Sequence, residues 1–148
     1  MASSATPEFG QAQSGCVYWE RSGAYALMLS PDGLLAVVEG REGRLYLPGG
    51  GYGEGETGEE ALLREAKEEG GWQIEIGPHF AEAIQYVEAG AEGDFRLHAR
   101  YYRARIIAEN IGVAEHRVAW LTLDEAAARL HRACDRWAVG RPAEVPLG

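Results

Sequence analysis

The sequence predicts an α/β domain in which helices pack on a mixed β-sheet. Two segments, residues 57–71 and Leu123–Trp137, have the apolar periodicity of helices, and several shorter segments are rich in β-branched and aromatic residues. The length of 148 residues suits one domain with a sizeable core. Apolar and charged fractions of 46% and 25% are ordinary for a globular protein, and no apolar run approaches the ~20 residues that cross a bilayer.

The N-terminal part of the chain indicates a lead followed by a strand hairpin. Met1–Gly15 is rich in Ala, Ser, Gln and Gly and lacks the apolar stretch of a secretory signal. We therefore expect a flexible lead outside the fold and a single domain over residues 16–148. Ser30-Pro31-Asp32-Gly33 is a turn signal inside this region. The expected strands are Cys16–Glu20, Ala24–Ser30, Leu34–Glu39 and Leu45–Leu47.

The first helix is expected to begin next to Thr57 and to end at Gly70-Gly71. Thr57 is a suitable N-cap because Glu60, three residues later, completes a capping box. Glycine at the C-terminal end is typical of a helix stop. The apolar stripe of this helix, which should bury against the sheet, consists of Leu62, Leu63 and Ala66.

The C-terminal half predicts further strands and a second helix. The expected strands are Trp72–Ile76, Phe80–Val87 and Phe95–Ile107, the last two joined by the glycine-rich segment Glu88–Asp94. In the last strand the polar positions change parity between Arg100 and Arg103, which indicates a β-bulge. Leu123–Trp137 is expected to be one amphipathic helix whose buried face is Leu123, Ala127, Leu130, Cys134 and Trp137. The tryptophans expected in the core are Trp120 and Trp137.

Charge and cysteine content exclude several classes of function. The net charge of −9 should prevent binding of nucleic-acid polymers by bulk electrostatics. Cys16 and Cys134 are far apart and belong to no CxxC motif, so we expect buried, reduced thiols in a cytoplasmic protein. No spacing typical of a zinc site is found among the histidines, which are His79, His98, His116 and His131.

Most of the negative charge is concentrated between Gly50 and Trp72. On a helix, Glu65, Glu68 and Glu69 share one face, and their mutual repulsion favours a bound cation. A hard divalent ion with oxygen ligands is the natural candidate. The alternative is a solvated helix face, but the preceding run Pro48–Gly51 favours a metal site. The segment holds two cations, Arg64 and Lys67, and seven carboxylates: Glu54, Glu56, Glu59, Glu60, Glu65, Glu68 and Glu69.

The same segment follows a defined pattern, Gly50-x5-Glu56-x7-Arg64-Glu65-Ala66-x-Glu68-Glu69-x-Gly71-Trp72. This pattern resembles the Nudix box of the Nudix hydrolase family, with every fixed position filled. The lead-in Leu47-Pro48-Gly49-Gly50 also matches that family. One departure is Gly53, where many relatives have a glutamate. The resemblance implies a three-layer α/β/α sandwich with a mixed sheet and hydrolysis of a nucleoside diphosphate linked to another group.

The resemblance also assigns expected roles to individual residues. Mg²⁺, with Mn²⁺ as an alternative, would be the cofactor. Glu65 is the first candidate for the general base and Glu68 the second, whereas Arg64 would orient the carboxylates and Glu56 would support them. The implied metal ligands are the carbonyl of Gly49 and the carboxylates of Glu65, Glu68, Glu69 and Glu115.

Outside the box, substrate-binding candidates lie on two expected strands. Arginines of Phe95–Ile107 are suited to hold phosphates or to stack on a base, although a solvated strand face is the alternative. Tyr86 resembles a tyrosine of dinucleoside polyphosphate hydrolases. The arginines are Arg96, Arg100 and Arg103.

The expected partner is a small nucleotide, with no nucleic-acid polymer and no membrane. The lead-in Leu47-Pro48-Gly49-Gly50 favours a MutT-like (deoxy)nucleoside triphosphate pyrophosphohydrolase, including action on oxidised nucleotides. A dinucleoside polyphosphate or nucleotide-sugar pyrophosphatase is the alternative. A non-catalytic nucleotide sensor or a structural calcium helix is disfavoured, because the box carboxylates and the glycine lead-in are all retained.

Overall fold

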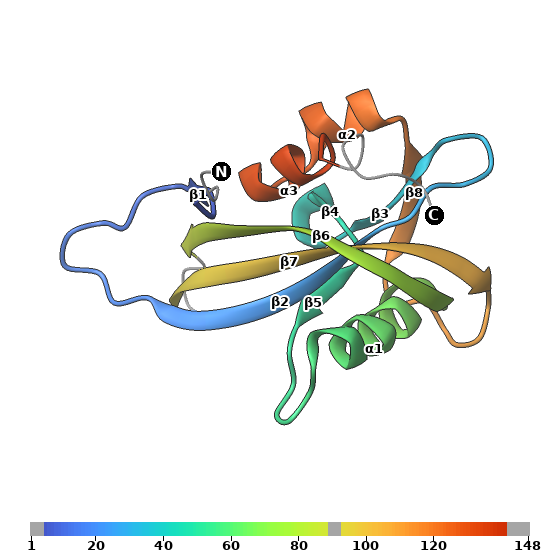
Figure 1. The fold of residues 1–148 in the computed structure, drawn as a ribbon, viewed down its shortest axis with the longest axis horizontal. Helices are drawn as coiled ribbons and strands as arrows, with labels where there is room; N and C mark the ends of the chain where they lie inside the picture. The colour runs from blue at the N-terminus through green and yellow to red at the C-terminus, as the bar shows by residue number, and fades with distance from the viewer. Residues whose placement is uncertain (1–4, 89–92, 142–148) are drawn as a thin grey trace.

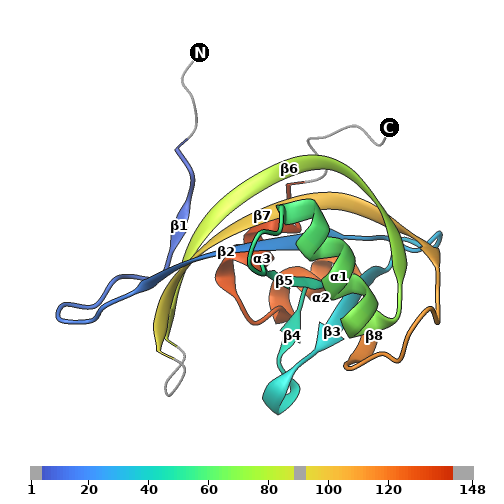
Figure 2. The same cartoon turned by 90° about the horizontal axis from the view of Figure 1, so that it is seen from below.

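Two long antiparallel strands, β6 (Gln73–Glu88) and β7 (Asp94–Ala108), curve across the molecule (Figure 2). The computed structural model describes residues 5–88 and 93–141. A five-stranded sheet has the order β1-β6-β7-β2-β5, with β1 (Glu8–Phe9) and β5 (Gly49–Gly51) at its edges and β2 (Trp19–Leu27) between β7 and β5. β1 runs parallel to β6 and β2 parallel to β7, whereas β5 is antiparallel to β2, so the sheet is mixed as predicted.

A smaller antiparallel sheet has the order β4-β3-β8. Its strands are β3 (Leu35–Glu39), β4 (Leu45–Tyr46) and β8 (Arg117–Leu121), and the 3-10 turn η1 (Arg41–Gly43) joins the first two. The amide of Ala36 donates to the carbonyl of Met28 at 3.0 Å, which ties this sheet to the chain leaving β2. The glycine strand β5 follows β4 directly, so the small sheet leads into the large one.

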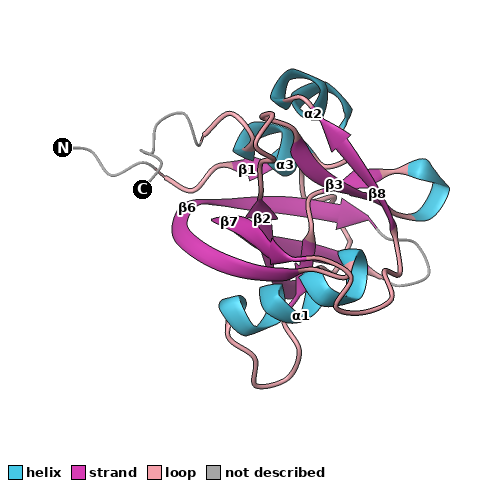
Figure 3. Cartoon of the chain, turned by 90° about the vertical axis from the view of Figure 1, so that its right-hand side faces the viewer, coloured by secondary structure: helices cyan, strands magenta, loops and turns pink. Residues whose placement is uncertain are grey.

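Helices cover the sheets on two opposite sides (Figures 1 and 3). The helix α1 (Gly58–Gly70) lies on one side, and α2 (Leu123–Arg129) and α3 (Ala133–Ala138) lie on the other. The predicted α/β/α layering is therefore confirmed.

The strand β2 separates two hydrophobic cores because its side chains alternate between the faces of the sheet. Ala24 and Ala26 face α1, in a core that also contains Leu62 and Trp72. Small residues here let the helix approach the sheet closely. On the opposite face, Tyr25, Leu27, Leu35, Leu97, Tyr101, Leu130 and Cys134 belong to the core beneath α2 and α3.

The ends of α1 confirm the prediction. The hydroxyl of Thr57 accepts from the amide of Glu60 at 3.2 Å, and the carboxylate of Glu60 accepts from the amide of Thr57 at 3.0 Å. Gly71 ends the helix with φ of 69°, a left-handed conformation that favours glycine. The expected stripe is wrong at Leu63, which is 45% exposed, whereas Leu62 is fully buried.

The expected helix Leu123–Trp137 is instead two short helices. Leu130 is extended, with φ of −60° and ψ of 141°. The following amide, that of His131, donates to the carbonyl of Leu45 at 2.9 Å, so the chain bonds to β4 instead of continuing the helix. The expected face is wrong at Leu123 and Ala127, which are exposed. The buried positions of the two helices and their junction are Ala126, Leu130, Cys134, Asp135 and Ala138.

The expected bulge lies on a different strand. The pairing of β7 with β2 is unbroken from Phe95 to Arg103, whereas β6 shifts register between Ile76 and Ala81. The strands expected at Trp72–Ile76 and Phe80–Val87 are thus one bulged strand. Polar parity on β7 changes because successive tyrosines enter different cores, Tyr101 under α2–α3 and Tyr102 under α1.

Several N-terminal and single-residue expectations also need correction. Residues 1–15 are expected to be a flexible lead outside the fold. However, the carbonyl of Pro7 accepts from the amide of Ile84 at 2.9 Å, and β1 adds a strand to the sheet. Phe9 is held there by Trp137, with ring centroids 5.9 Å apart.

Two residues expected to be buried are not. Cys16 is an exposed free thiol, and Trp120 is 39% exposed. The segment expected to connect β6 and β7 lies partly outside the described residues. No described helix is long and apolar enough to cross a membrane.

Leu62 and Leu63 offer a matched test of this packing. Leu62→Ala should lower the free energy of unfolding by about 2–5 kcal/mol, because it leaves a cavity between α1 and the sheet. Leu63→Ala should change it by less than about 1 kcal/mol, because that side chain is half in solvent. Urea denaturation of both variants measures the difference, and equal losses would contradict the assigned helix face.

Candidate active site

A glycine strand lies directly under the acidic helix. β5 pairs with β2, with Gly49 opposite Tyr25 and Gly51 opposite Gly23. Gly49 has φ of 139°, and a Cβ there would overlap the carbonyl oxygen of Ala24. Glycine is therefore required at this position for the strand to approach β2 so closely.

Two carboxylates of α1 reach down to this strand. The amide of Gly49 donates to Oε1 of Glu69 at 2.7 Å, and Glu69 is only 9% exposed. Glu65 lies over the next glycine, because a Cβ on Gly50 would be 2.7 Å from the carboxyl carbon of Glu65. The glycine run thus leaves room for carboxylates where side chains would otherwise stand.

Arg64 connects the carboxylates to one another. Its guanidinium binds Glu56 at 2.7 and 2.8 Å in a bidentate pair. The same group donates to Glu65 at 2.8 Å, to Glu68 at 3.3 Å and to the carbonyl of Gly51 at 3.1 Å. Hydrogen bonds from Arg64, and then the amide of Gly53, lower the pKa of Glu56 to about 2. Arg64 thus joins three carboxylates and one backbone carbonyl in a single network.

The loop before β8 closes on the C-terminal end of α1. The amide of Glu115 donates to the carbonyl of Glu68 at 2.9 Å, and the amide of His116 donates to that of Glu69 at 3.2 Å. These bonds satisfy carbonyls that a helix end leaves free. They also bring the carboxylate of Glu115 near the box, where its charge helps to raise the pKa of both Glu65 and Glu69.

The site contains more negative charge than its surroundings stabilise. Burial raises the pKa of Glu69 to about 8; the Gly49 amide opposes this shift, and the charges of Glu65, Glu68 and Glu115 reinforce it. Burial also raises the pKa of Glu65, against the effect of Arg64. A divalent cation with a preference for oxygen ligands would relieve this excess, so the donor set fits Mg²⁺.

The carboxylates do not converge on a single point in this arrangement. Among the described residues, no three Asp, Glu, His or Cys side chains are grouped at metal-binding geometry. Their contacts account for this, since Arg64 holds Glu56, Glu65 and Glu68, and the Gly49 amide holds Glu69.

A cavity of about 260 Å³ opens beside the glycine strand and Glu69. Aromatic and apolar side chains of β2, β4 and β7 contribute to its wall, together with cations that no motif indicated. Those not expected from the sequence are Arg21, Tyr25, Arg41, Tyr46, Phe95, Leu97, His116 and Arg132.

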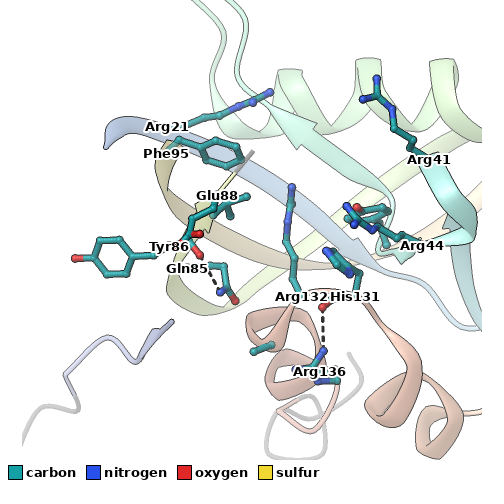
Figure 4. Close-up of a pocket in the computed structure, with 13 residues that line it drawn as sticks. Arg21, Arg41, Arg44, Gln85, Tyr86, Glu88, Phe95, His131, Arg132 and Arg136 are labelled. Atoms are coloured by element: carbon teal, nitrogen blue, oxygen red, sulfur yellow. Dashed lines mark hydrogen bonds between the residues drawn. The ribbon is translucent and has the colours of Figure 1, made fainter. Parts of the chain in front are cut away.

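A second cavity, of about 570 Å³, continues from the first (Figure 4). Arg21, Arg41, Tyr46, Phe95 and Arg132 line both of them. The three arginines come from β2, η1 and the α2–α3 junction, so no sequence spacing links them. The only local signal is the position of Arg41, in a short loop just before the glycine run.

The arginines predicted from β7 lie elsewhere. Arg96 donates to Glu20 at 3.1 Å, and Arg100 lies 3.5 Å from Glu82. Even-numbered residues of β7 point away from Phe95 and Leu97, the side chains of this strand that line the cavity. Arg103 lines a separate cavity of about 710 Å³ near Pro31 and Pro78.

Tyr86 is at the border of the second cavity, of about 570 Å³. It is one of the lining residues, but its ring points away from the other lining side chains (Figure 4). The hydroxyl of Tyr86 accepts from Nε of Arg96 at 3.3 Å. Tyr86 therefore belongs with the outer pair Arg96–Glu20 and not with the glycine strand.

Comparison with known proteins gives the family. The model of the NUDIX domain matches residues 19–138. The MutT protein of Methanosarcina mazei Go1 has a similar structure, with a TM-score of 0.66 and 20% identity over 83% of this chain and 92% of that one. A MutT NUDIX hydrolase of Burkholderia pseudomallei has a TM-score of 0.60 and 25% identity over 82% and 97%. An ADP-ribose pyrophosphatase of Streptococcus suis has a TM-score of 0.64 and 16% identity over 86% and 94%. No curated protein matches the chain.

The fold and the acidic helix therefore define a hydrolase of phosphorus-containing acid anhydrides. The chain belongs to the Nudix family.

The raised pKa of Glu69 predicts a pH-dependent stability in the metal-free protein. A protonated Glu69 stabilises the fold fully below its unfolded pKa of about 4.5. This contribution is lost as the pH rises through the folded pKa of about 8. In EDTA, the wild type should therefore lose stability between pH 5 and pH 8.5 relative to Glu69→Gln, by on the order of a few kcal/mol.

Thermal denaturation at both pH values measures this difference. Glu59→Gln, at an exposed position of the same helix, serves as the control and should follow the wild type. Parallel profiles for wild type and Glu69→Gln would show that Glu69 is ionised in the folded protein.

Proposed function

We propose that this protein is a Mg²⁺-dependent pyrophosphohydrolase that cleaves a nucleoside diphosphate linked to another moiety, with Mn²⁺ as an alternative cofactor. One observation carries the proposal: Glu65 and Glu69 of α1 lie against the glycine strand β5, at the edge of a cavity with aromatic walls. A diphosphate is an anion, and this acidic edge would repel it without a cation.

The proposed metal ligands are oxygen donors of the glycine strand β5, of α1 and of the loop before β8. When bound, the ion supplies charge neutralisation at phosphate oxygens and lowers the pKa of a bound water. The ligands would be the Gly49 carbonyl with Glu65, Glu68, Glu69 and Glu115.

The chain's own residues would divide the remaining work. Glu65 is the proposed acceptor of the proton from the attacking water, with Glu68 as the alternative. Both side chains are more exposed to solvent than that of Glu69. Arg64 positions these two carboxylates through its hydrogen bonds, and Glu56 fixes Arg64 by the bidentate pair. Tyr46 and Phe95, each with an arginine over its ring, are the aromatic residues proposed to contact a nucleobase.

The proposed substrate is a (deoxy)nucleoside triphosphate, including oxidised nucleotides. The lead-in Leu47-Pro48-Gly49-Gly50 and the similarity to two MutT structures support this choice. A second candidate is a dinucleoside polyphosphate or a nucleotide sugar. The second cavity, of about 570 Å³, favours it because there is room for another moiety beyond the first. In either case the substrate is a small nucleotide, not a polymer.

A substrate screen is the direct test. Nucleoside triphosphates, dinucleoside polyphosphates and nucleotide sugars are incubated with Mg²⁺ or Mn²⁺ at mildly alkaline pH, and products are separated by chromatography. We expect metal-dependent release of a nucleoside monophosphate, and EDTA should abolish it. Binding of nucleotides without cleavage of any would instead support a non-catalytic sensor.

Substitutions on α1 test the assigned metal face. Glu68→Gln and Glu69→Gln should each lower kcat by about 10²-fold or more, because each removes a charge that would hold the cation. The fold should be retained, since loss of a carboxylate also relieves repulsion. Glu59→Gln is the control on the same helix and should keep wild-type kcat. Losses of similar size at Glu59 and Glu69 would overturn the assignment.

A further inference from the structure

The second cavity, of about 570 Å³, is lined by cationic side chains in a protein whose net charge is −9. One described carboxylate, Glu88, also lines it. Figure 4 shows Arg21 extending from the β2 side and Arg132 from the junction of α2 and α3. The lining arginines are Arg21, Arg41, Arg44, Arg132 and Arg136.

Most of these charges have no carboxylate at ion-pair distance, although the buried Asp135 interacts electrostatically with Arg132. Within residues 5–88 and 93–141, Arg21, Arg41 and Arg132 form no ion pair with a carboxylate, and Arg44 pairs with the exposed Glu42 at 3.2 Å. Such an exposed pair has little stabilising value. Arg136 donates to the carbonyls of Leu130 and His131, so its role is partly structural.

Neutral aromatic groups hold the two central arginines in place. The guanidinium carbon of Arg21 lies 5.1 Å from the centre of the Phe95 ring. Arg132 donates to the hydroxyl of Tyr25 at 3.1 Å and lies 5.2 Å from the centre of the Tyr46 ring. These contacts orient the guanidinium groups without neutralising them.

A neighbouring histidine reports the resulting positive potential. The pKa of His131 is lowered, first by burial and then by the charges of Arg44, Arg132 and Arg136. The cavity is therefore prepared for an anion, and guanidinium groups match phosphate oxygens in a bidentate geometry.

We infer that the substrate carries a further phosphate, remote from the diphosphate that is cleaved, and that arginines of the second cavity bind it. These arginines are Arg21, Arg41, Arg44 and Arg132. This inference rests on the proposed function and narrows its substrate class. The two cavities share Arg21, Arg41 and Arg132, so one molecule can extend from Glu69 to the cationic end. A neutral sugar or base would offer these arginines no anionic partner.

Two kinds of nucleotide supply such a phosphate, and matched pairs distinguish them. NADPH and NADH differ by a phosphate ester on a ribose, whereas adenosine tetraphosphate and ATP differ by a phosphate at the end of the chain. With Mg²⁺, the phosphate-bearing member of one pair should have a KM at least about tenfold lower, equivalent to about 1.4 kcal/mol.

The double variant Arg41→Gln/Arg44→Gln tests the residues. Both side chains are exposed in or beside η1, so the fold should be retained. The variant should raise KM for the phosphate-bearing member about tenfold and change kcat less than about twofold, because ground and transition states are bound alike. KM for the other member should rise much less, because that member lacks the phosphate that these arginines would bind. Arg129→Gln, at an exposed position of α2 outside both cavities, is the control.

Direct binding separates this inference from the proposed function. In EDTA at low ionic strength, calorimetry should show a preference for the same member of the pair, and the double variant should lose it. Preference in binding without any turnover in Mg²⁺ would overturn the proposed function and leave the phosphate site standing. Turnover with equal KM within both pairs, or equal loss for both members in the variant, would overturn the phosphate site alone.

Discussion

The Gly49–Gly51 strand and α1 lie so close together that their contact determines how the acidic site is arranged. The strand has no side chains, so the helix can place Glu65 and Glu69 against its backbone. That contact buries Glu69 and concentrates negative charge at one point of the surface. Arg64 then holds the outer carboxylates in a fixed arrangement. A Cβ on Gly50 would overlap the carboxylate of Glu65, and a Cβ on Gly49 would overlap the backbone of Ala24.

The cleft that begins at this contact has charges of opposite sign at its two ends. The acidic end is built from one helix and the loop at its C-terminus, whereas the basic end is built from β2, η1 and the α2–α3 junction. Tyr46 and Phe95 line the region between them. A molecule with an anion at each end would thus require a cation at the first and would meet arginines directly at the second.

The acidic end could be predicted from the sequence because its determinants are local. The capping box at Thr57, the glycine at position 71 and the spacing of Glu65, Glu68 and Glu69 all lie within one short segment. Glu115 could be predicted as a site residue only through the resemblance to a family. It comes near the acidic helix because backbone amides of its loop bond to helix carbonyls, which is a tertiary contact. The basic end could not be predicted, because Arg21 and Arg132 meet only after the chain has folded. The β7 arginines were not a guide to this end of the cleft. Side chains alternate along a strand, so Arg96 and Arg100 lie on the face opposite to Phe95 and Leu97, which line the cavity. The break at Leu130 was equally hidden, since the amide bond of His131 to Leu45 is a tertiary contact.

The turn of the β3–β4 hairpin, residues 41–44, carries Arg41 and Arg44 and lies outside both hydrophobic cores. Its side chains are exposed, and it joins two strands of the smaller sheet, separate from the helix that carries the carboxylates. Mutations in the hairpin can therefore accumulate with little effect on folding or on the hydrolytic residues. Such a division allows descendants of one gene to acquire different substrate ranges while the reaction itself is inherited unchanged.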